Sequence, residues 1–192
     1  MRVVAHYLAA GFLAAALCVF VPGCQSNQNV QAAHENADTH ATNPNAVLND
    51  ADKNFVIEAV RGNIKERYIG LVVLAESQNK DIKDYAQMLV DDHTKALKEL
   101  VDLMEKSGMQ QPTGLPAVKQ EAERMLSGLS GAVLDRKFIE IMVEDHEKYL
   151  SEFRREANTA QASELKDYVT RMIPVLQKHL QEAQELQGKL GL

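Results

Sequence analysis

The sequence lacks the features of several protein classes. It has no Trp, two Cys and five Pro among 192 residues, and its net charge is −6. Without a surplus of Lys and Arg it lacks the basic surface that nucleic-acid binding needs, so we expect no nucleic-acid partner. It shows no Gly-rich phosphate loop, Cys-x-x-Cys pair or Ser–His–Asp motif, so it does not favour an enzyme. No long run alternates apolar and polar residues, so no strand is predicted.

The N-terminal segment reads as a targeting signal. Arg2 precedes an apolar run from Leu8 to Val21, which fits a signal-peptide core and is short for a transmembrane helix. The run ends in "VPGC", which resembles a bacterial lipobox, the motif whose Cys is lipidated and becomes the mature N-terminus. We therefore predict a signal peptide over residues 1–23 and a lipid on Cys24. The alternative is an ordinary secreted protein cut near Gly23.

The lipid would decide where the protein resides. Gln25 follows the Cys, and under the enteric-type sorting rule a residue other than Asp at this position implies the outer membrane. We expect a cell-envelope lipoprotein that faces the periplasm and contacts the membrane through Cys24, or else a secreted periplasmic protein. Cys18 would leave with the signal, so no internal disulfide is possible. No sequence feature indicates a protein partner.

Residues 24–50 have the composition of a tether. They are rich in Asn, Gln, Ala, Thr and His, and they contain no Lys or Arg. Because they lack the apolar residues that a core requires, we predict a flexible segment. His34 and His40 lie in it and are expected to be solvated.

Residues 51–190 show the periodicity of helices. We predict long helices over 51–77, 81–106, 133–158 and 162–188, with a short one near 117–127, and we expect Asp81 and Ser163 to act as N-caps. An internal repeat with an offset of 83 residues pairs "DKNF" with "DRKF" and "IKDY" with "LKDY". The predicted fold is therefore all-α: a ferritin-like four-helix bundle of two helical hairpins, joined by a long crossover that contains the short extra helix.

Three histidines occupy positions that should face the core. His93 and His146 lie in the similar stretches "MLVDDHTKAL" and "IMVEDHEKYL", and His179 lies in the last helix. Counted from the turns, these residues and Glu66 fall at nearly the same height, near the middle of the bundle. Imidazole and carboxylate groups together suit zinc, copper or iron. We therefore predict that Glu66, His93, His146 and His179 hold one transition-metal ion.

Several residues near the predicted metal ligands allow two interpretations each. Asp92 and Asp145 each precede a histidine. In one reading they form an outer shell, together with Tyr149, that accepts hydrogen bonds from the metal ligands. In the other reading the two aspartates are solvated charges. Gly62 and Gly70 flank Glu66, and they either leave room for a ligand or allow close helix packing. Met142 and Met172 offer thioethers that suit copper, or they simply fill the core.

Two alternatives to a metal site remain open. The buried groups can neutralise one another and only fix the register of the helices, as in a structural or stress-related envelope module. An oxidoreductase would need an open coordination position. A di-iron site is disfavoured because the Glu-x-x-His pattern is missing: the residues three positions before the histidines are Val90, Val143 and Leu176.

The order and spacing of these motifs resemble domain-of-unknown-function family 4142, often labelled "predicted outer membrane protein". The similarity covers about residues 52–187 and is carried by Glu66 with Gly70, "MLVDDH" with His93, "LDRKF…MVEDH" with Asp135 and His146, and "IPVLQKHL" with Pro174 and His179. The resemblance implies a ferritin-like four-helix bundle. It implies no activity, so the metal hypothesis comes from the positions of the residues.

Overall fold

A computed structural model describes residues 47–192 of the chain. The predicted signal peptide, Cys24 and most of the predicted tether lie outside the described residues. The described part contains five helices and no strand: α1 Asp50–Glu76, α2 Lys80–Lys106, α3 Leu115–Leu126, α4 Gly131–Thr159 and α5 Ser163–Leu190. The predicted all-α, ferritin-like bundle is confirmed, and every predicted helix end lies within two residues of the observed one.

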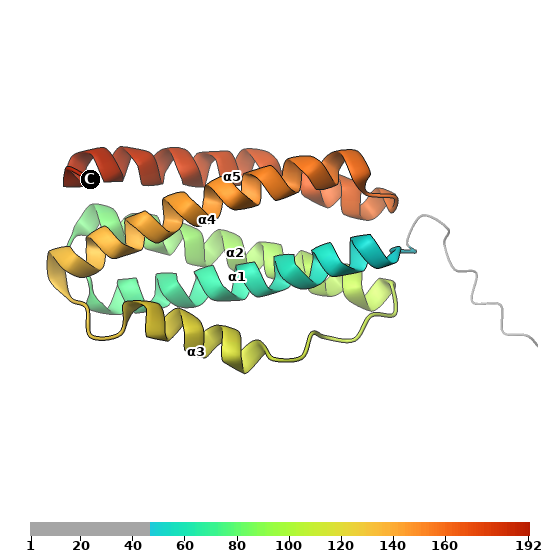
Figure 1. The fold of residues 1–192 in the computed structure, drawn as a ribbon, viewed down its shortest axis with the longest axis horizontal. Helices are drawn as coiled ribbons and strands as arrows, with labels where there is room; N and C mark the ends of the chain where they lie inside the picture. The colour runs from blue at the N-terminus through green and yellow to red at the C-terminus, as the bar shows by residue number, and fades with distance from the viewer. Residues whose placement is uncertain (1–46) are drawn as a thin grey trace, which may run out of the picture. The chain divides into compact units, whose positions relative to one another are not determined.

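The four long helices form two antiparallel hairpins that pack side by side (Figure 1). Helices α1 and α2 form the first hairpin and α4 and α5 the second, while α1 also packs on α4 and α2 on α5. The connection from α2 to α4 returns along the length of the bundle and carries α3, which packs on the outside of α1 (Figure 1). This is the predicted crossover with its extra helix.

The packed region starts just before α1. Leu48 is 2% exposed and belongs to the apolar core, although it lies in the segment predicted as a tether. Asn49 is the N-cap of α1: its side chain accepts a hydrogen bond from the Asp52 backbone, and the Asp52 side chain accepts one from the Asn49 backbone. This capping box fixes the start of the helix.

The predicted caps of α2 and α5 are corrected by the structure. Asn79, and not Asp81, is the N-cap of α2, because its side chain accepts a hydrogen bond from the Asp81 backbone N–H. Ser163 is the first residue of α5, whose N-cap is Ala162. An alanine side chain cannot cap a helix.

Asp52 of the other hairpin binds the turn that leads into α5. Its carboxylate accepts hydrogen bonds from the backbone N–H groups of Gln161 at 3.4 Å and Ala162 at 3.3 Å. Asp135 is the equivalent residue of the second hairpin, 83 residues later, and it accepts a 2.6 Å hydrogen bond from the Ser77 hydroxyl at the turn of the first. Each hairpin therefore places one buried carboxylate in the turn of the other, which explains the repeated "DKNF" and "DRKF".

The apolar core has two parts separated by a polar layer. One part contains residues such as Val56, Leu100 and Phe153, and the other contains residues such as Ile69, Leu89 and Phe138. Along each long helix one buried polar side chain lies between the residues of these two parts: Glu66, His93, His146 and His179. The polar layer is thus enclosed by apolar side chains on both sides.

The two glycines near Glu66 serve close packing. A Cβ atom on Gly62 would lie 3.0 Å from the Tyr149 hydroxyl oxygen, and one on Gly70 would lie 2.8 Å from Cγ2 of Val90. Of the two readings of these glycines, the structure supports close packing, since neighbouring side chains already fill the space beside them.

Gly70→Ala should lower the free energy of unfolding by about 1–2 kcal/mol, because the cost of overpacking exceeds the gain in helix propensity. The matched control is Gly188→Ala, since a Cβ atom there meets nothing within 4 Å. It should raise stability by up to about 1 kcal/mol. Urea unfolding followed by circular dichroism measures both, and equal effects of the two variants would contradict the packing role of Gly70.

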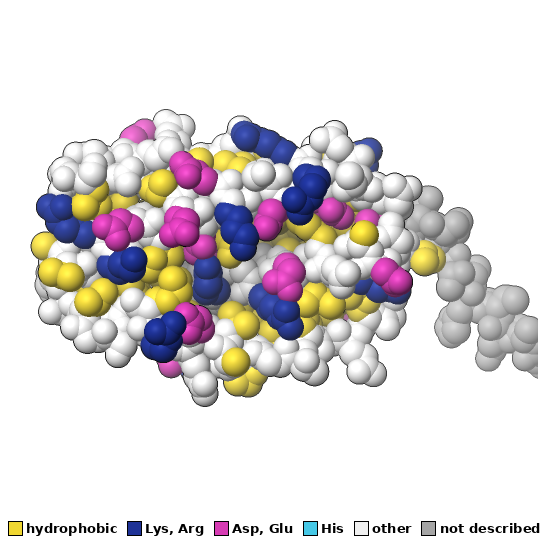
Figure 2. All heavy atoms as spheres, in the orientation of Figure 1, with side chains coloured by type: hydrophobic (Ala, Val, Ile, Leu, Met, Phe, Trp, Pro, Cys, Tyr) yellow, Lys and Arg dark blue, Asp and Glu magenta, His cyan; other side chains and the backbone are white. Residues whose placement is uncertain are grey.

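The surface of the bundle mixes charges of both signs. Lys and Arg side chains alternate with Asp and Glu on the face in Figure 2, and no histidine appears on that face. None of the helices within residues 47–192 has the length and hydropathy needed to span a bilayer.

Candidate metal site

Four polar side chains, one from each long helix, meet inside the bundle. Glu66, His146 and His179 are 0% exposed and His93 is 3% exposed. One ring nitrogen from each histidine lies within 4.8 Å of the corresponding atoms of the other two. The structure therefore brings together all four residues predicted to bind a metal, at the common height that the sequence indicated.

The outer nitrogen of each ring faces an acceptor. His93 Nδ1 lies 2.9 Å from Asn63 Oδ1, and the Asn63 amide is oriented by its own donation to the Ala59 carbonyl at 2.7 Å. His146 Nδ1 lies 2.9 Å from the Met142 carbonyl oxygen. His179 Nε2 lies 3.2 Å from the Asp92 carboxylate. Because each of these three groups can accept, the outer nitrogen of each ring is placed to donate a hydrogen bond.

The inner nitrogens lie close together, and those of His93 and His146 face the Glu66 carboxylate. Glu66 Oε2 lies 2.7 Å from His93 Nε2 and 3.4 Å from His146 Nε2, and His146 Nε2 lies 3.1 Å from His179 Nδ1. Neither Glu66 oxygen makes a well-directed hydrogen bond to any described residue. A buried carboxylate needs a neutralising partner, and here that partner is either a proton on a ring nitrogen or a metal ion.

The spacing of these atoms fits a metal ion. Nitrogen and oxygen ligands at 2.0–2.1 Å from a tetrahedral zinc ion lie about 3.3 Å from one another. Three of the separations, 2.7, 3.1 and 3.4 Å, lie around that value, and the three ring nitrogens all lie within 4.8 Å of one another. The three histidines can therefore hold a metal ion with small movements of their side chains, and Glu66 is in place to join them.

The charges of the cluster suit the same role. Burial would raise the pKa of the Glu66 carboxyl, but His146 and His93 outweigh burial and lower it to about 2. Burial lowers the pKa of His146 despite the opposing effect of Glu66, and burial with the other two rings lowers the pKa of His179 to about 4. At neutral pH the site thus combines the anionic Glu66 carboxylate with neutral imidazoles at His146 and His179, the protonation states that metal ligands need.

The predicted outer residues have different environments. Asp92 contacts His179 and also pairs with Lys95 at 3.2 Å. Asp145 instead forms a 2.6 Å ion pair with Lys65, and burial, reinforced by Glu66, raises its pKa. Tyr149 makes an edge contact with His146, with ring centroids 6.4 Å apart. Of the three, Asp92 is the one that accepts a hydrogen bond from a ring nitrogen.

Sequence reasoning missed two acceptors. Asn63 precedes Glu66 by three residues, and its place on the buried face of α1 is a signal that could have identified it, because a buried amide needs partners. The Met142 carbonyl belongs to the backbone, and no residue type marks it. Pro174 lies within α5, which continues as a helix on both sides of it and carries His179 into the cluster.

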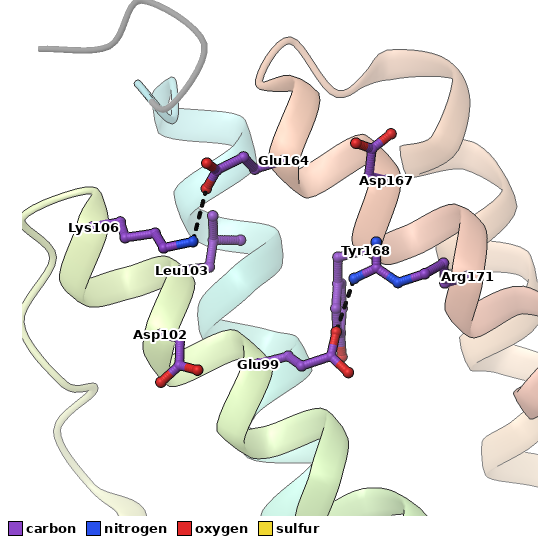
Figure 3. Close-up of a pocket in the computed structure, with 8 residues that line it drawn as sticks. All are labelled: Glu99, Asp102, Leu103, Lys106, Glu164, Asp167, Tyr168 and Arg171. Carbon is purple, nitrogen blue, oxygen red and sulfur yellow. Dashed lines mark hydrogen bonds and ion pairs between the residues drawn. The ribbon is translucent and has the colours of Figure 1, made fainter.

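A separate surface pocket of about 280 Å³ lies between α2 and α5 (Figure 3). Two ion pairs cross it, Lys106–Glu164 at 3.8 Å and Arg171–Glu99 at 2.9 Å. Exposed pairs of this kind contribute at most about 1 kcal/mol. The charges are partly balanced within the pocket, and no histidine lines it, so the buried cluster is the stronger candidate for a site.

Comparison with known proteins agrees with this architecture. The family "Domain of unknown function (DUF4142)" matches residues 37–186. The chain belongs to the DUF4142 family. A solved structure, "Crystal structure of DUF305 fragment from Deinococcus radiodurans", is similar with a TM-score of 0.60 and 13% sequence identity, and the match covers 74% of this chain and 99% of that one. No match was found among curated proteins.

These matches establish family and fold. At 13% identity the DUF305 fragment supports the helical fold alone. This DUF4142 protein is a helical bundle in which three buried histidines lie close enough together to hold a metal ion.

Proposed function

We propose that this DUF4142 protein binds one transition-metal ion through Glu66 Oε2, His93 Nε2, His146 Nε2 and His179 Nδ1. The observation that carries the proposal is the geometry of the rings: the outer nitrogen of each histidine faces an acceptor, Asn63, Met142 or Asp92. The inner nitrogens gather beside Glu66 Oε2, within 4.8 Å of one another. Outward donation to a fixed acceptor is how metal-binding histidines are held in other proteins.

The ligand set suits zinc, copper or iron, as the sequence predicted. Three histidines and one carboxylate complete a tetrahedral shell, and a closed shell is typical of sites that hold an ion for structure or storage. We infer a role in metal handling in the cell envelope, and the buried position of all four ligands supports slow release of the ion.

The direct test is the metal content of residues 25–192. The protein, freed of metal with a chelator, is reconstituted with zinc, copper or iron, dialysed and measured by mass spectrometry. We expect one ion per chain for at least one metal, and the same content when His34 and His40 are replaced by Ala. A content near zero for all three metals would refute the proposal.

Asp92→Asn should weaken metal binding about 10- to 100-fold, because the His179 Nε2–H group loses its anionic acceptor. Asp145→Asn is the matched control, since Asp145 also precedes a ligand histidine but pairs with Lys65. Competition titration against a chromophoric chelator measures both affinities. A larger loss for Asp145→Asn than for Asp92→Asn would contradict the assigned role of Asp92.

The anchor is part of the same proposal. We infer an outer membrane lipoprotein attached through Cys24, and the support is the apolar run followed by "VPGC" and Gln25. Cells that express the full chain with radiolabelled palmitate should yield a labelled protein, and Cys24→Ser should remove the label. A Cys24→Ser variant that is still labelled would overturn this assignment.

A metal-free structural role is the second candidate, and the 2.7 Å contact between Glu66 and His93 favours it, because a shared proton also neutralises that pair. In this case the cluster only fixes helix register. His93→Leu separates the two functions. A structural role predicts an unchanged or higher melting temperature and no effect of metal on either protein, whereas the metal site predicts metal-dependent stability that His93→Leu removes.

A further inference from the structure

A small, partly open cavity lies next to the histidine cluster. Its volume is about 20 Å³, which exceeds the roughly 10–15 Å³ that one water-sized probe needs. It lies on one side of the polar layer, within the part of the apolar core that contains Val56, Leu100 and Phe153. All four long helices contribute to its wall, which consists of Ala59, Gly62, Asn63, His93, Tyr149, Phe153, Met172 and Leu176.

The cavity offers little to a water molecule. A buried water needs two to four polar partners. Both polar atoms of the Asn63 amide already have partners, His93 and the Ala59 carbonyl, and the two ring nitrogens of His93 face Asn63 and Glu66. Apart from the Tyr149 hydroxyl, the rest of the wall is apolar. A cavity with such an apolar wall favours small apolar molecules over water.

Tyr149 and Gly62 are shared by this cavity and a surface pocket. Both residues also line an open pocket of about 420 Å³ between α1, α3 and α4. The Tyr149 hydroxyl lies against Gly62, only 3.0 Å from where a Cβ atom would be. Rotation of this single side chain would connect the two spaces, while the glycine leaves room for the hydroxyl in the closed position.

We propose that this cavity binds one small apolar molecule of diatomic size, such as dioxygen or nitric oxide, which enters from the surface pocket past Tyr149. The binding is noncovalent and depends on the shape and apolar wall of the cavity. It does not rest on the proposed metal site. If that site holds an ion, the bound molecule is beside one of its ligands, His93.

Xenon is the probe for this proposal, because it is apolar and binds dry cavities. The metal-free chain, labelled with ¹³C in its methyl groups, is titrated with dissolved xenon. We expect saturable shifts of the Ala59, Met172 and Leu176 methyl resonances, with no such shifts for Leu89 and Leu134 in the other part of the core. Shifts that grow linearly across all methyl groups, or no shifts, would overturn the proposal.

Two variants change the cavity in opposite directions. Ala59→Leu should fill it and abolish the xenon-dependent shifts, whereas Leu176→Ala should enlarge it and strengthen binding. Tyr149→Ala should speed xenon exchange, while Lys148→Ala, which alters the surface pocket alone, should leave the exchange rate unchanged. Unaltered exchange in Tyr149→Ala would exclude this entry route. Because the experiment contains no metal, its failure leaves the metal proposal standing, and the reverse also holds.

Discussion

A transition-metal ion should raise the free energy of unfolding of the metal-free chain by about 4 kcal/mol when its free concentration is a thousandfold above its Kd. The ion binds the folded state because only folding brings Glu66 and the three histidines from four helices to one point. For a domain of this size the gain corresponds to roughly 8–16 °C in melting temperature. Differential scanning calorimetry with and without zinc, copper or iron measures it.

His146 is the best residue for testing the source of that gain. Its inner nitrogen is close to both Glu66 and His179, and its outer one is fixed by the Met142 carbonyl. His146→Ala should therefore remove most of the metal-dependent stabilisation. The variant with His34 and His40 replaced by Ala should keep all of it. Equal stabilisation of His146→Ala and the unaltered chain would place the binding elsewhere.

Acidification should destabilise the metal-free protein steeply from about pH 6.5 downward. Burial lowers the pKa of His146 and, together with the other rings, brings that of His179 to about 4, so the unfolded chain binds more protons than the folded one between pH 6.5 and 4. Glu66, with its pKa lowered to about 2, adds to the effect below pH 4.5. Stability falls by about 1.4 kcal/mol per pH unit for each proton taken up on unfolding.

The control for this effect is His179→Gln, which cannot take up the proton. Between pH 6.5 and 4, the free energy of unfolding of this variant should fall less steeply, because unfolding takes up as much as one proton fewer. The difference in free energy of unfolding above pH 7.5 gives the cost of the substitution itself. Urea unfolding at half-unit pH steps gives the slopes. Equal slopes for His179→Gln and the unaltered chain would show that His179 is not held neutral in the fold.

Helix positions and the height of the cluster were predictable because both follow from local rules. A stripe such as Leu89, His93, Ala96 and Leu100 can face only one way once the helix forms, and the rise per residue converts a count from the turn into a distance. Two hairpins with short turns then leave few ways to arrange four helices. The convergence of Glu66 with His93 follows from that geometry.

The outer contacts of the site were less predictable, because they depend on side-chain rotamers. Asp92 and Asp145 stand in nearly identical "DH" motifs, yet one contacts a histidine and the other pairs with Lys65. The bond from Asp52 to the second turn joins residues more than 100 positions apart. Nothing in the local sequence marks a carboxylate that binds a distant turn.

The duplication that builds the frame does not extend to the ligands. Shifted by 83 residues, Glu66 corresponds to Tyr149 and Asn63 to His146, while His93 corresponds to Leu176 and Ala96 to His179. The 83-residue repeat therefore relates no predicted metal ligand to another one. The helices are thus related by an approximate two-fold repeat, but the four ligand residues are not. An ion bound among them would have a different environment on each side, so its coordination shell would have a single orientation.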